Sequence, residues 1–339
     1  MKEFKKYCHI ENSYQAEYIQ AVKERVNNPS LQWICQEKVH GAQSQFIIGR
    51  EGDSIQVGFG KRSSELQADE NFYNWQELLG RYQANAIKLF ELLERDGYDV
   101  SNGINAYGEF FGGSFPGVIK KGVIRIQKGV AYTPDHEFYG FDIFIREKGY
   151  MEPEKAIEYY KEAGFFYAET LFKGTLDECL KYPCVFQSTI PGRLGLTPPE
   201  NNEAEGVVIK PCVPQYFGNG ERIVIKHKNP KFQEVVKGER KVKTEISRSE
   251  DYNALAFLVP DYINENRLVS VRSHLGETRL PQDFGKIMKE YTADVIQELI
   301  LESKERSVIF ESLDKSEQKA INSLISKLCA ENIKAVYMS

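Results

Sequence analysis

The chain has 339 residues, of which 41% are hydrophobic and 27% charged, and it carries a formal net charge of −5. That length suggests about two globular domains, and the sequence has no apolar run of the roughly 18 residues that would cross a membrane. The N-terminus shows no secretion signal and the six cysteines show no C-x-x-C pair. These features argue against secretion, a zinc site and a disulfide framework, and they predict a cytoplasmic protein (host cytoplasm if the source is viral).

The first part of the chain mixes strand and helix patterns. An amphipathic helix is expected from Trp75 to Arg95, where Gly97 stops it, and a shorter helix from Pro153 to Gly164. The proline- and glycine-rich segment 191–203 is expected to be a surface loop. Apolar and β-branched runs predict strands at 31–36, 44–48, 55–59, 104–111, 138–145, 206–209 and 223–225. The first three strands are expected to form a meander with short polar turns.

Beyond about Thr244 long helical patterns replace the strands, near 252–266, 283–306 and 313–330. The segment 238–247 is charged and has no apolar periodicity, so it is predicted to be a linker. The predicted fold class is therefore α+β. Residues 1–240 are expected to form a domain of mixed and antiparallel sheets with flanking helices, and residues 248–339 a small all-α domain.

Lys38 lies in the segment Glu37–Gly41, at the exit of an apolar strand and before a glycine turn. A K-x-x-G pattern alone occurs about once by chance in a chain this long. The pattern gains weight from Lys210, which ends a later apolar strand, and from Lys226 and Lys228, which share one face of another. Such cations suit a triphosphate and favour the unprotonated, nucleophilic amine of Lys38. Each lysine taken alone is also explained as an edge-strand residue that deters aggregation.

Aromatic and acidic residues add a possible base and ribose site. In the strand 138–145, alternation is expected to place Asp142 on the same face as Phe138 and Gly140, and Phe141 on the other. Phe141 could stack on a purine or belong to the core. Glu109, flanked by aromatics and glycines, is a candidate for contact with a ribose hydroxyl or a Mg²⁺-bound water.

A basic stretch follows from 226 to 243, and it suits either phosphate contact or a solvated surface. It contains Lys226, Lys228, Lys231, Lys237, Arg240, Lys241 and Lys243, against Glu234 and Glu239.

The order of these motifs resembles the covalent nucleotidyltransferases, which include DNA ligases, mRNA capping enzymes and RNA ligases. The sequence is most similar to the RNA ligase 2 family, that is, the bacteriophage nick-sealing enzymes and their trypanosome RNA-editing relatives. The segments that carry this similarity are 4–7, 37–41, 205–212, 219–220, 223–228, 231–232 and 283–286. The resemblance implies an ATP-grasp-like nucleotidyltransferase domain at the N-terminus.

The resemblance also implies roles for individual residues. Lys38 would accept AMP from ATP, with Lys226, Lys228 and Arg62 as further catalytic residues. Glu205 is implied as a metal ligand and Glu109 as a metal contact through water. The residues implied in ATP and AMP binding are Glu37, Lys38, His40, Gln43, Arg62, Glu109, Phe141, Asp142, Glu205, Lys210, Lys226 and Lys228. Two positions depart from the family, which often has arginine where Gln36 stands and asparagine where Gln43 stands.

The implied activity is that of an ATP-dependent RNA ligase, a monomer that seals 3′-hydroxyl/5′-phosphate breaks, mainly nicks in duplex RNA, through lysyl-AMP. Mg²⁺ is the implied cofactor, which Mn²⁺ can replace, and the helical domain would bind RNA. The alternatives are a DNA ligase, a capping-type guanylyltransferase, or a non-catalytic nucleotide- or RNA-binding homologue. The first two usually have aspartate where His40 stands and a β-barrel at the C-terminus, and a pure binder would need no nucleophile.

Overall fold

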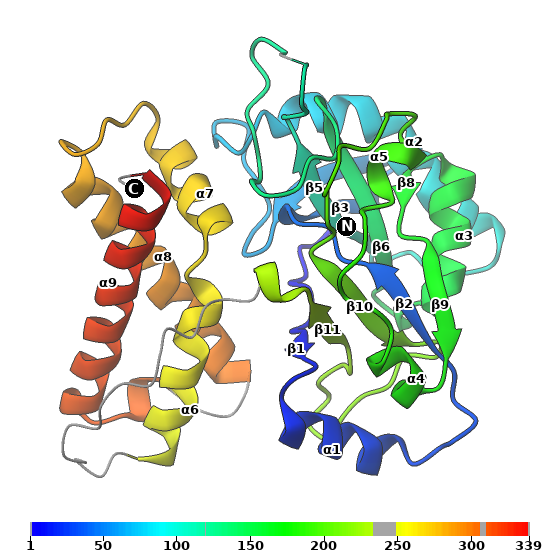
Figure 1. The fold of residues 1–339 in the computed structure, drawn as a ribbon. Helices are drawn as coiled ribbons and strands as arrows, with labels where there is room; N and C mark the ends of the chain where they lie inside the picture. Colours follow the sequence, from blue (N-terminus) through cyan, green and yellow to red (C-terminus); the bar gives the residue numbers. More distant parts are fainter. Residues whose placement is uncertain (1, 119, 233–248, 306–309, 338–339) are drawn as a thin grey trace. The chain divides into compact units, whose positions relative to one another are not determined.

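The computed structural model describes residues 2–118, 120–232, 249–305 and 310–337 (Figure 1). The chain divides into two compact units, Met1–Gln233 and Glu234–Ser339. The linker predicted at 238–247, the domain boundary between 240 and 248, and the basic residues at 237–243 lie outside the described residues. The α+β class is confirmed, since the first unit contains mixed sheets with helices and the described part of the second is helical. None of the described helices is both long and apolar enough to cross a membrane.

The first unit is built on two sheets. The five-stranded sheet has the order β1 (Glu11–Asn12), β11 (Ile225–Lys228), β10 (Gly206–Pro211), β2 (Trp33–Glu37) and β9 (Thr170–Gly174). The six-stranded sheet has the order β4 (Ser54–Lys61), β3 (Ala42–Glu51), β5 (Ile104–Gly112), β6 (His136–Ile145) and β7 (Gly149–Tyr150), and β8 (Phe166–Tyr167) pairs with β6. The pairs β1–β11 and β6–β8 are parallel and the other pairs antiparallel.

Helices cover one face of each sheet. Helices α2 (Trp75–Arg95) and α3 (Pro153–Ala163) pack against the six-stranded sheet (Figure 1). Helices α1 (Ala16–Val26) and α4 (Leu176–Leu180) contribute Val22 and Cys179 to the core that covers the five-stranded sheet. The short helices α5 (Ile190–Arg193) and η1 (Pro230–Phe232) complete the first unit. On the other side, an ion pair between Lys210 of β10 and Asp142 of β6 joins the two sheets.

The expected meander of the first three strands is wrong. Strand β2 pairs with β9 and β10, whereas β3 pairs with β4 and β5, so the two consecutive strands lie in different sheets. The K-x-x-G segment is the link between them. A side chain at Gly41 would bring its Cβ to 2.5 Å from the carbonyl oxygen of Phe110, so the backbone passes β5 too closely for any other residue.

The helix predictions of the first unit are confirmed. Helix α2 begins and ends as expected, and Gly97 follows it with φ +80° and an N–H that donates to Glu94 O at 3.0 Å. Helix α3 starts at a proline, as helix N-termini tolerate, and closes at Gly164 with φ +85°. The strand predicted at 223–225 lies further along the chain. Ile223 and Val224 are buried but precede β11, and β11 itself carries Lys226 and Lys228.

The second unit is an all-helical bundle in its described residues. It contains α6 (Glu250–Leu258), η2 (Val259–Tyr262), α7 (Glu265–Leu275), α8 (Phe284–Glu305), η3 (Phe310–Ser312) and α9 (Lys315–Tyr337). Leu268, Tyr291, Ile321 and Ile325 belong to its buried core. The single helix predicted over 252–266 is wrong, since Pro260 lies in a 3₁₀ turn that separates α6 from α7.

Candidate active site

The side chain of Lys38 points to a buried carboxylate. Its backbone N–H donates to Gly206 O at 2.9 Å, which fixes the exit of β2 against β10. Its Nζ lies 2.9 Å from Oε2 of Glu205, a residue that is only 3% exposed. Lys228 Nζ lies 3.3 Å from Oε1 of the same carboxylate, and His40 Nδ1 lies 3.4 Å from Oε2. Four residues that the sequence singled out therefore converge on one point.

The sequence predicted only cations around Lys38, whereas the structure places the Glu205 carboxylate there as well. Burial by itself would raise the pKa of Glu205, but the charges of Lys38 and Lys228 and the hydrogen bond from His40 outweigh burial and hold that pKa well below its usual range. Glu205 is therefore an anion, and an anion at 2.9 Å favours the ammonium form of Lys38. The cation cluster alone does not explain a free amine.

Glu109 and Arg62 approach the same point from the other sheet. Glu109 lies on β5 opposite Gln43 of β3, and Arg62 directly follows β4. The pKa of Glu109 is raised to about 8. Desolvation is the main cause and the charge of Glu205 adds to it, whereas Lys38 and Arg62 partly offset the rise. Gln43 Nε2 is buried without a hydrogen-bond partner among the described residues. The Gln43 side chain thus keeps an unused donor beside Glu109.

The raised pKa of Glu109 predicts a pH-dependent stability. Between its ordinary value of 4.5 and about 8, the folded chain holds a proton that the unfolded chain has released. The resulting stabilisation is complete below pH 4.5 and is lost as the pH rises through about 8. Glu109→Gln is expected to remove this contribution to the pH dependence of the free energy of unfolding. Urea unfolding followed by fluorescence measures it, because both tryptophans, Trp33 and Trp75, are buried in the first unit. The exposed control is Glu158→Gln, whose free energy of unfolding should depend on pH as that of wild type does. The same pH dependence in Glu109→Gln would contradict the prediction.

Asp142 and Lys210 form a second, fully buried cluster between the sheets. Asp142 is 0% exposed, and it accepts two hydrogen bonds from Arg222 at 2.9 and 3.0 Å and one from the Tyr7 hydroxyl. Lys210 Nζ lies 2.9 Å from Asp142 Oδ2, and its side chain is 1% exposed. Burial would raise the pKa of Asp142, but Arg222 and Lys210 outweigh it and lower that pKa to about 2. One anion therefore holds two buried cations.

The predicted faces of the strand 138–145 are wrong because of a β-bulge. The register pairs Gly140 with Gly108 and Asp142 with Tyr107, so Phe141 is an extra residue. Gly140 faces Tyr160 of α3, whereas Asp142 turns to the opposite face, where Lys210 lies.

Phe141 occupies a position that suits an aromatic platform. It is half-buried, its carbonyl oxygen accepts from Lys210 Nζ at 3.0 Å, and that Nζ lies 5.1 Å from the centre of its ring. The ring of Tyr7 packs edge-on against it, with ring centres 5.2 Å apart. Phe141 is therefore fixed in place while part of it stays accessible.

Glu37 and Gln36 are not aimed at the Lys38 amine. The buried Glu37 carboxylate accepts from Ser188 Oγ at 2.5 Å, from Thr189 N at 2.8 Å and from Thr189 Oγ1 at 2.7 Å, and burial raises its pKa. These bonds tie β2 to the start of α5. Gln36 donates to Ala168 O at 3.0 Å, and its Oε1 is buried without a partner in the described part of the chain.

Lys226 lies beside an N-terminal edge strand. Ser13 N donates to Lys226 O at 2.9 Å, and β1 pairs with β11 so that Asn12 lies opposite Lys226. Burial would raise the pKa of Glu11, but hydrogen bonds from His9 and the Asn12 backbone, with the charge of Lys226, lower it to about 2. No role had been predicted for this strand, nor for Arg222, Ser188 and Thr189.

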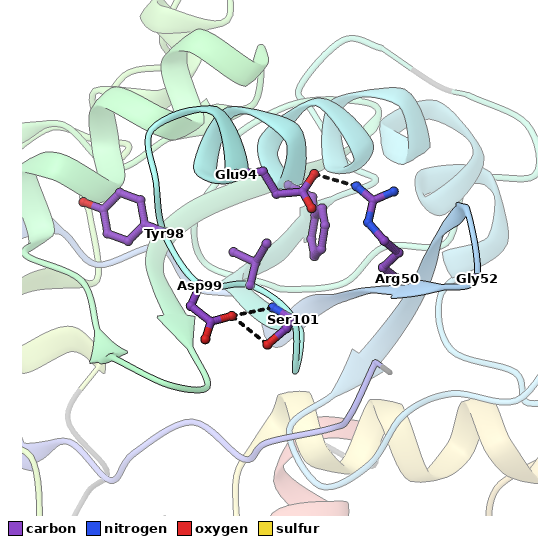
Figure 2. A pocket seen from close by; sticks show the side chains of 8 residues that line it. Arg50, Gly52, Glu94, Tyr98, Asp99 and Ser101 are labelled. Atoms are coloured by element: carbon purple, nitrogen blue, oxygen red, sulfur yellow. Dashed lines mark hydrogen bonds and ion pairs between the residues drawn. The ribbon is translucent and has the colours of Figure 1, made fainter.

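A surface depression of about 540 Å³ lies apart from these residues (Figure 2). Its charged side chains are paired within it, Arg50 with Glu94, and Asp99 with the backbone and hydroxyl of Ser101. The lining residues are Arg50, Gly52, Phe90, Glu94, Tyr98, Asp99, Val100 and Ser101. None of the residues gathered around Lys38 lines it.

Comparisons with known proteins identify family models and relatives that match this chain. The family model described as RNA ligase matches residues 31–228, and the model described as T4 RNA ligase 2 C-terminal matches residues 246–331. The mitochondrial RNA-editing ligase 1 of Trypanosoma brucei brucei is 31% identical over 58% of this chain and 47% of its own length. The mitochondrial RNA-editing ligase 2 of Trypanosoma brucei brucei (strain 927/4 GUTat10.1) is 26% identical over 91% of this chain and 89% of its own. The chain thus spans about half the length of the first of these relatives.

Among solved structures, a mutant of Naegleria gruberi RNA ligase with ATP and Mn is 16% identical, with a TM-score of 0.44, over 68% of this chain and 59% of that one.

Proposed function

This chain belongs to the RNA ligase family, and from that premise we propose that it is an ATP-dependent RNA ligase. It would join a 3′-hydroxyl to a 5′-phosphate, acting as a monomer on nicked duplex RNA, through a lysyl-AMP intermediate. The observation that carries the proposal is the convergence of Lys38, His40 and Lys228 on the buried Glu205 carboxylate. A protein that only bound nucleotide would need no nucleophilic amine at that point.

The first step forms the covalent intermediate. The lone pair of Lys38 Nζ attacks the α-phosphorus of ATP, the new N–P bond forms, and the bond to the β-phosphate oxygen breaks, so that pyrophosphate leaves. Lys228, beside Glu205, and Lys226, on the same strand face, supply positive charge that stabilises the developing charge on the α-phosphate oxygens. Arg62 acts from the other side, next to Glu109.

The second and third steps transfer AMP and close the strand. An oxygen of the RNA 5′-phosphate attacks the phosphorus of lysyl-AMP, and the N–P bond breaks to return the amine to Lys38. The RNA 3′-hydroxyl then attacks the activated 5′-phosphorus, AMP leaves, and a phosphodiester bond remains. Phe141 is the proposed platform for adenine, because its half-buried ring is held by Lys210 and Tyr7.

Glu109 and Glu205 fit a divalent cation. The two carboxylates lie close enough for Glu205 to raise the pKa of Glu109, and a cation between them would relieve that repulsion. No group of three potential ligands gathers in the described residues, and Mg²⁺ typically takes one or two carboxylates with phosphate oxygens and waters. Mg²⁺, or Mn²⁺ in its place, would neutralise triphosphate oxygens and compete with the Lys38 ammonium for Glu205, which favours the free amine.

The two domains would have separate roles. Residues 1–240 are the proposed adenylyltransferase domain, and residues 248–339 the proposed RNA-binding domain. The match of residues 246–331 to the C-terminal family model supports the extent of the second domain.

Sealing assays test the function. With ATP and Mg²⁺, the purified protein is expected to seal a nicked RNA duplex, whereas GTP in place of ATP, or a nicked DNA duplex in place of RNA, is expected to give little product. Sealing restricted to DNA would indicate a DNA ligase. A covalent label from GTP and none from ATP would indicate a capping-type enzyme. Either result would overturn the proposal.

A further inference from the structure

The loop between β5 and β6 carries a local excess of positive charge. From Gly113 to Pro134 the sequence contains four cations and no aspartate or glutamate, in a chain whose net charge is −5. The cations are Lys120, Lys121, Arg125 and Lys128. Figure 1 shows this segment as a loop that reaches beyond the end of β5. We call residues 113–128 the basic loop, of which all but residue 119 is described.

The tip of the basic loop is open to a partner. Lys120, Lys121 and Arg125 are exposed. Lys120 forms an exposed ion pair with Asp135, which follows the acid-free stretch, whereas Lys121 has no ion-pair partner in the described part of the chain. Val118 is 41% exposed and Ile124 36% exposed beside them. Exposed cations such as these can neutralise the phosphates of a nucleic-acid backbone.

The base of the basic loop is firmly attached to the sheet. Gly112 N donates to Gln127 Oε1 at 3.0 Å, Ile126 N to Gly112 O at 3.1 Å, and Gly113 N to Asp135 O at 3.0 Å. A Cβ at Gly112 would lie 2.0 Å from Asp135 O, at a φ of +105°, so the backbone packs closely there. The base of the loop is therefore fixed to the sheet.

The residues that follow the basic loop contact the candidate active site. The Tyr132 hydroxyl accepts from the backbone N–H of His40 at 2.9 Å, and Ala131 N donates to Asn202 Oδ1 at 2.8 Å, three residues before Glu205. Glu109 lies three residues before Gly112 on β5. The segment that leaves the basic loop is therefore hydrogen-bonded to the neighbours of Lys38 and Glu205.

We propose that the basic loop binds the phosphate backbone of the RNA substrate beside the break, with Lys120 and Lys121 as the contacts. This proposal rests on the RNA ligase function. Neither lysine takes part in the chemistry, and the loop acts after AMP has been transferred to Lys38, when the RNA must be held.

The test compares two double variants of the full chain with the same loss of charge. Lys120→Gln with Lys121→Gln removes the proposed contacts. Lys88→Gln with Lys161→Gln removes two exposed lysines from α2 and α3, on the helical side of the six-stranded sheet. Binding of nicked duplex RNA is measured over a series of salt concentrations, and lysyl-AMP formation from ATP is measured alongside.

The loop variant is expected to bind nicked RNA roughly tenfold more weakly than wild type, with a salt dependence shallower by about one to two phosphate contacts. Its lysyl-AMP formation should match that of wild type, which also shows that the fold is intact. Equal RNA affinity and equal salt slope in the two double variants would overturn the proposal and point to a protein partner for the loop. Loss of lysyl-AMP in the loop variant alone would also overturn it. Absence of lysyl-AMP in wild type would instead refute the RNA ligase function.

Discussion

Lys38→Arg is expected to abolish the covalent adenylate completely, with no label from ATP above background. Arginine keeps the positive charge and can still pair with Glu205, which lies 2.9 Å from the amine. Its guanidinium stays protonated at any pH at which the protein is folded, so it offers no lone pair to phosphorus. The measurement is incubation with α-labelled ATP and Mg²⁺ followed by denaturing electrophoresis.

Two controls make the Lys38 experiment specific. Lys88→Arg changes an exposed lysine on α2 in the same way, and it should label like wild type. RNA that already carries a 5′-adenylate bypasses the first two steps, so the Lys38→Arg variant should still join it. Equal labelling of Lys38→Arg and wild type would show that another group accepts AMP.

Asp142→Asn is expected to destabilise the first unit by about 3–5 kcal/mol, since it leaves two buried cations without their anion. The side chains of Lys210 and Arg222 are 1% and 2% exposed, so water cannot replace the lost charge. Urea unfolding followed by the fluorescence of Trp33 and Trp75 reports on this unit. The control is Glu154→Gln, which breaks the exposed pair with Lys173 and should cost only about 0–1 kcal/mol.

The same cluster predicts the direction of an acid effect. The pKa of Asp142 is lowered from 3.8 to about 2, so its stabilisation is fully present above pH 3.8 and is lost as the pH falls through about 2. The stability difference between wild type and Asp142→Asn should therefore shrink over that window. If Asp142→Asn costs no more than the Glu154→Gln control at neutral pH, the cluster does not hold the two sheets together.

Local patterns predicted α2 and α3 well, missed α1, and predicted the pairing of the strands poorly. The limits of α2 follow from apolar spacing and a glycine stop, both of which lie within the segment itself. The separation of β2 from β3 depends on how closely the backbone at Gly41 passes β5, a contact between residues about 70 positions apart. The bulge at Phe141 likewise depends on the partner strand, and alternation within one segment does not reveal it.

The residues of the candidate site were easier to predict than their partners. The motifs singled out Lys38, Glu205 and Lys228, which the structure brings together, although Lys38 and Glu205 are 167 positions apart. They also singled out Asp142 and Lys210, but not Arg222, the second cation on that carboxylate. An arginine before an apolar pair carries no local sign of burial. The anion beside Lys38 was missed as a partner because charge pairing between distant strands leaves no trace in spacing.

We propose that the ε-amine of Lys38 is the group that carries AMP between ATP and RNA. The most direct measurement is peptide mass mapping of the protein after incubation with ATP and Mg²⁺. We expect one adenylyl group, joined through an acid-labile N–P bond to Lys38 and released as AMP-RNA when 5′-phosphorylated nicked RNA is added. An adenylyl group on any other residue, or one on Lys38 that RNA cannot remove, would contradict it.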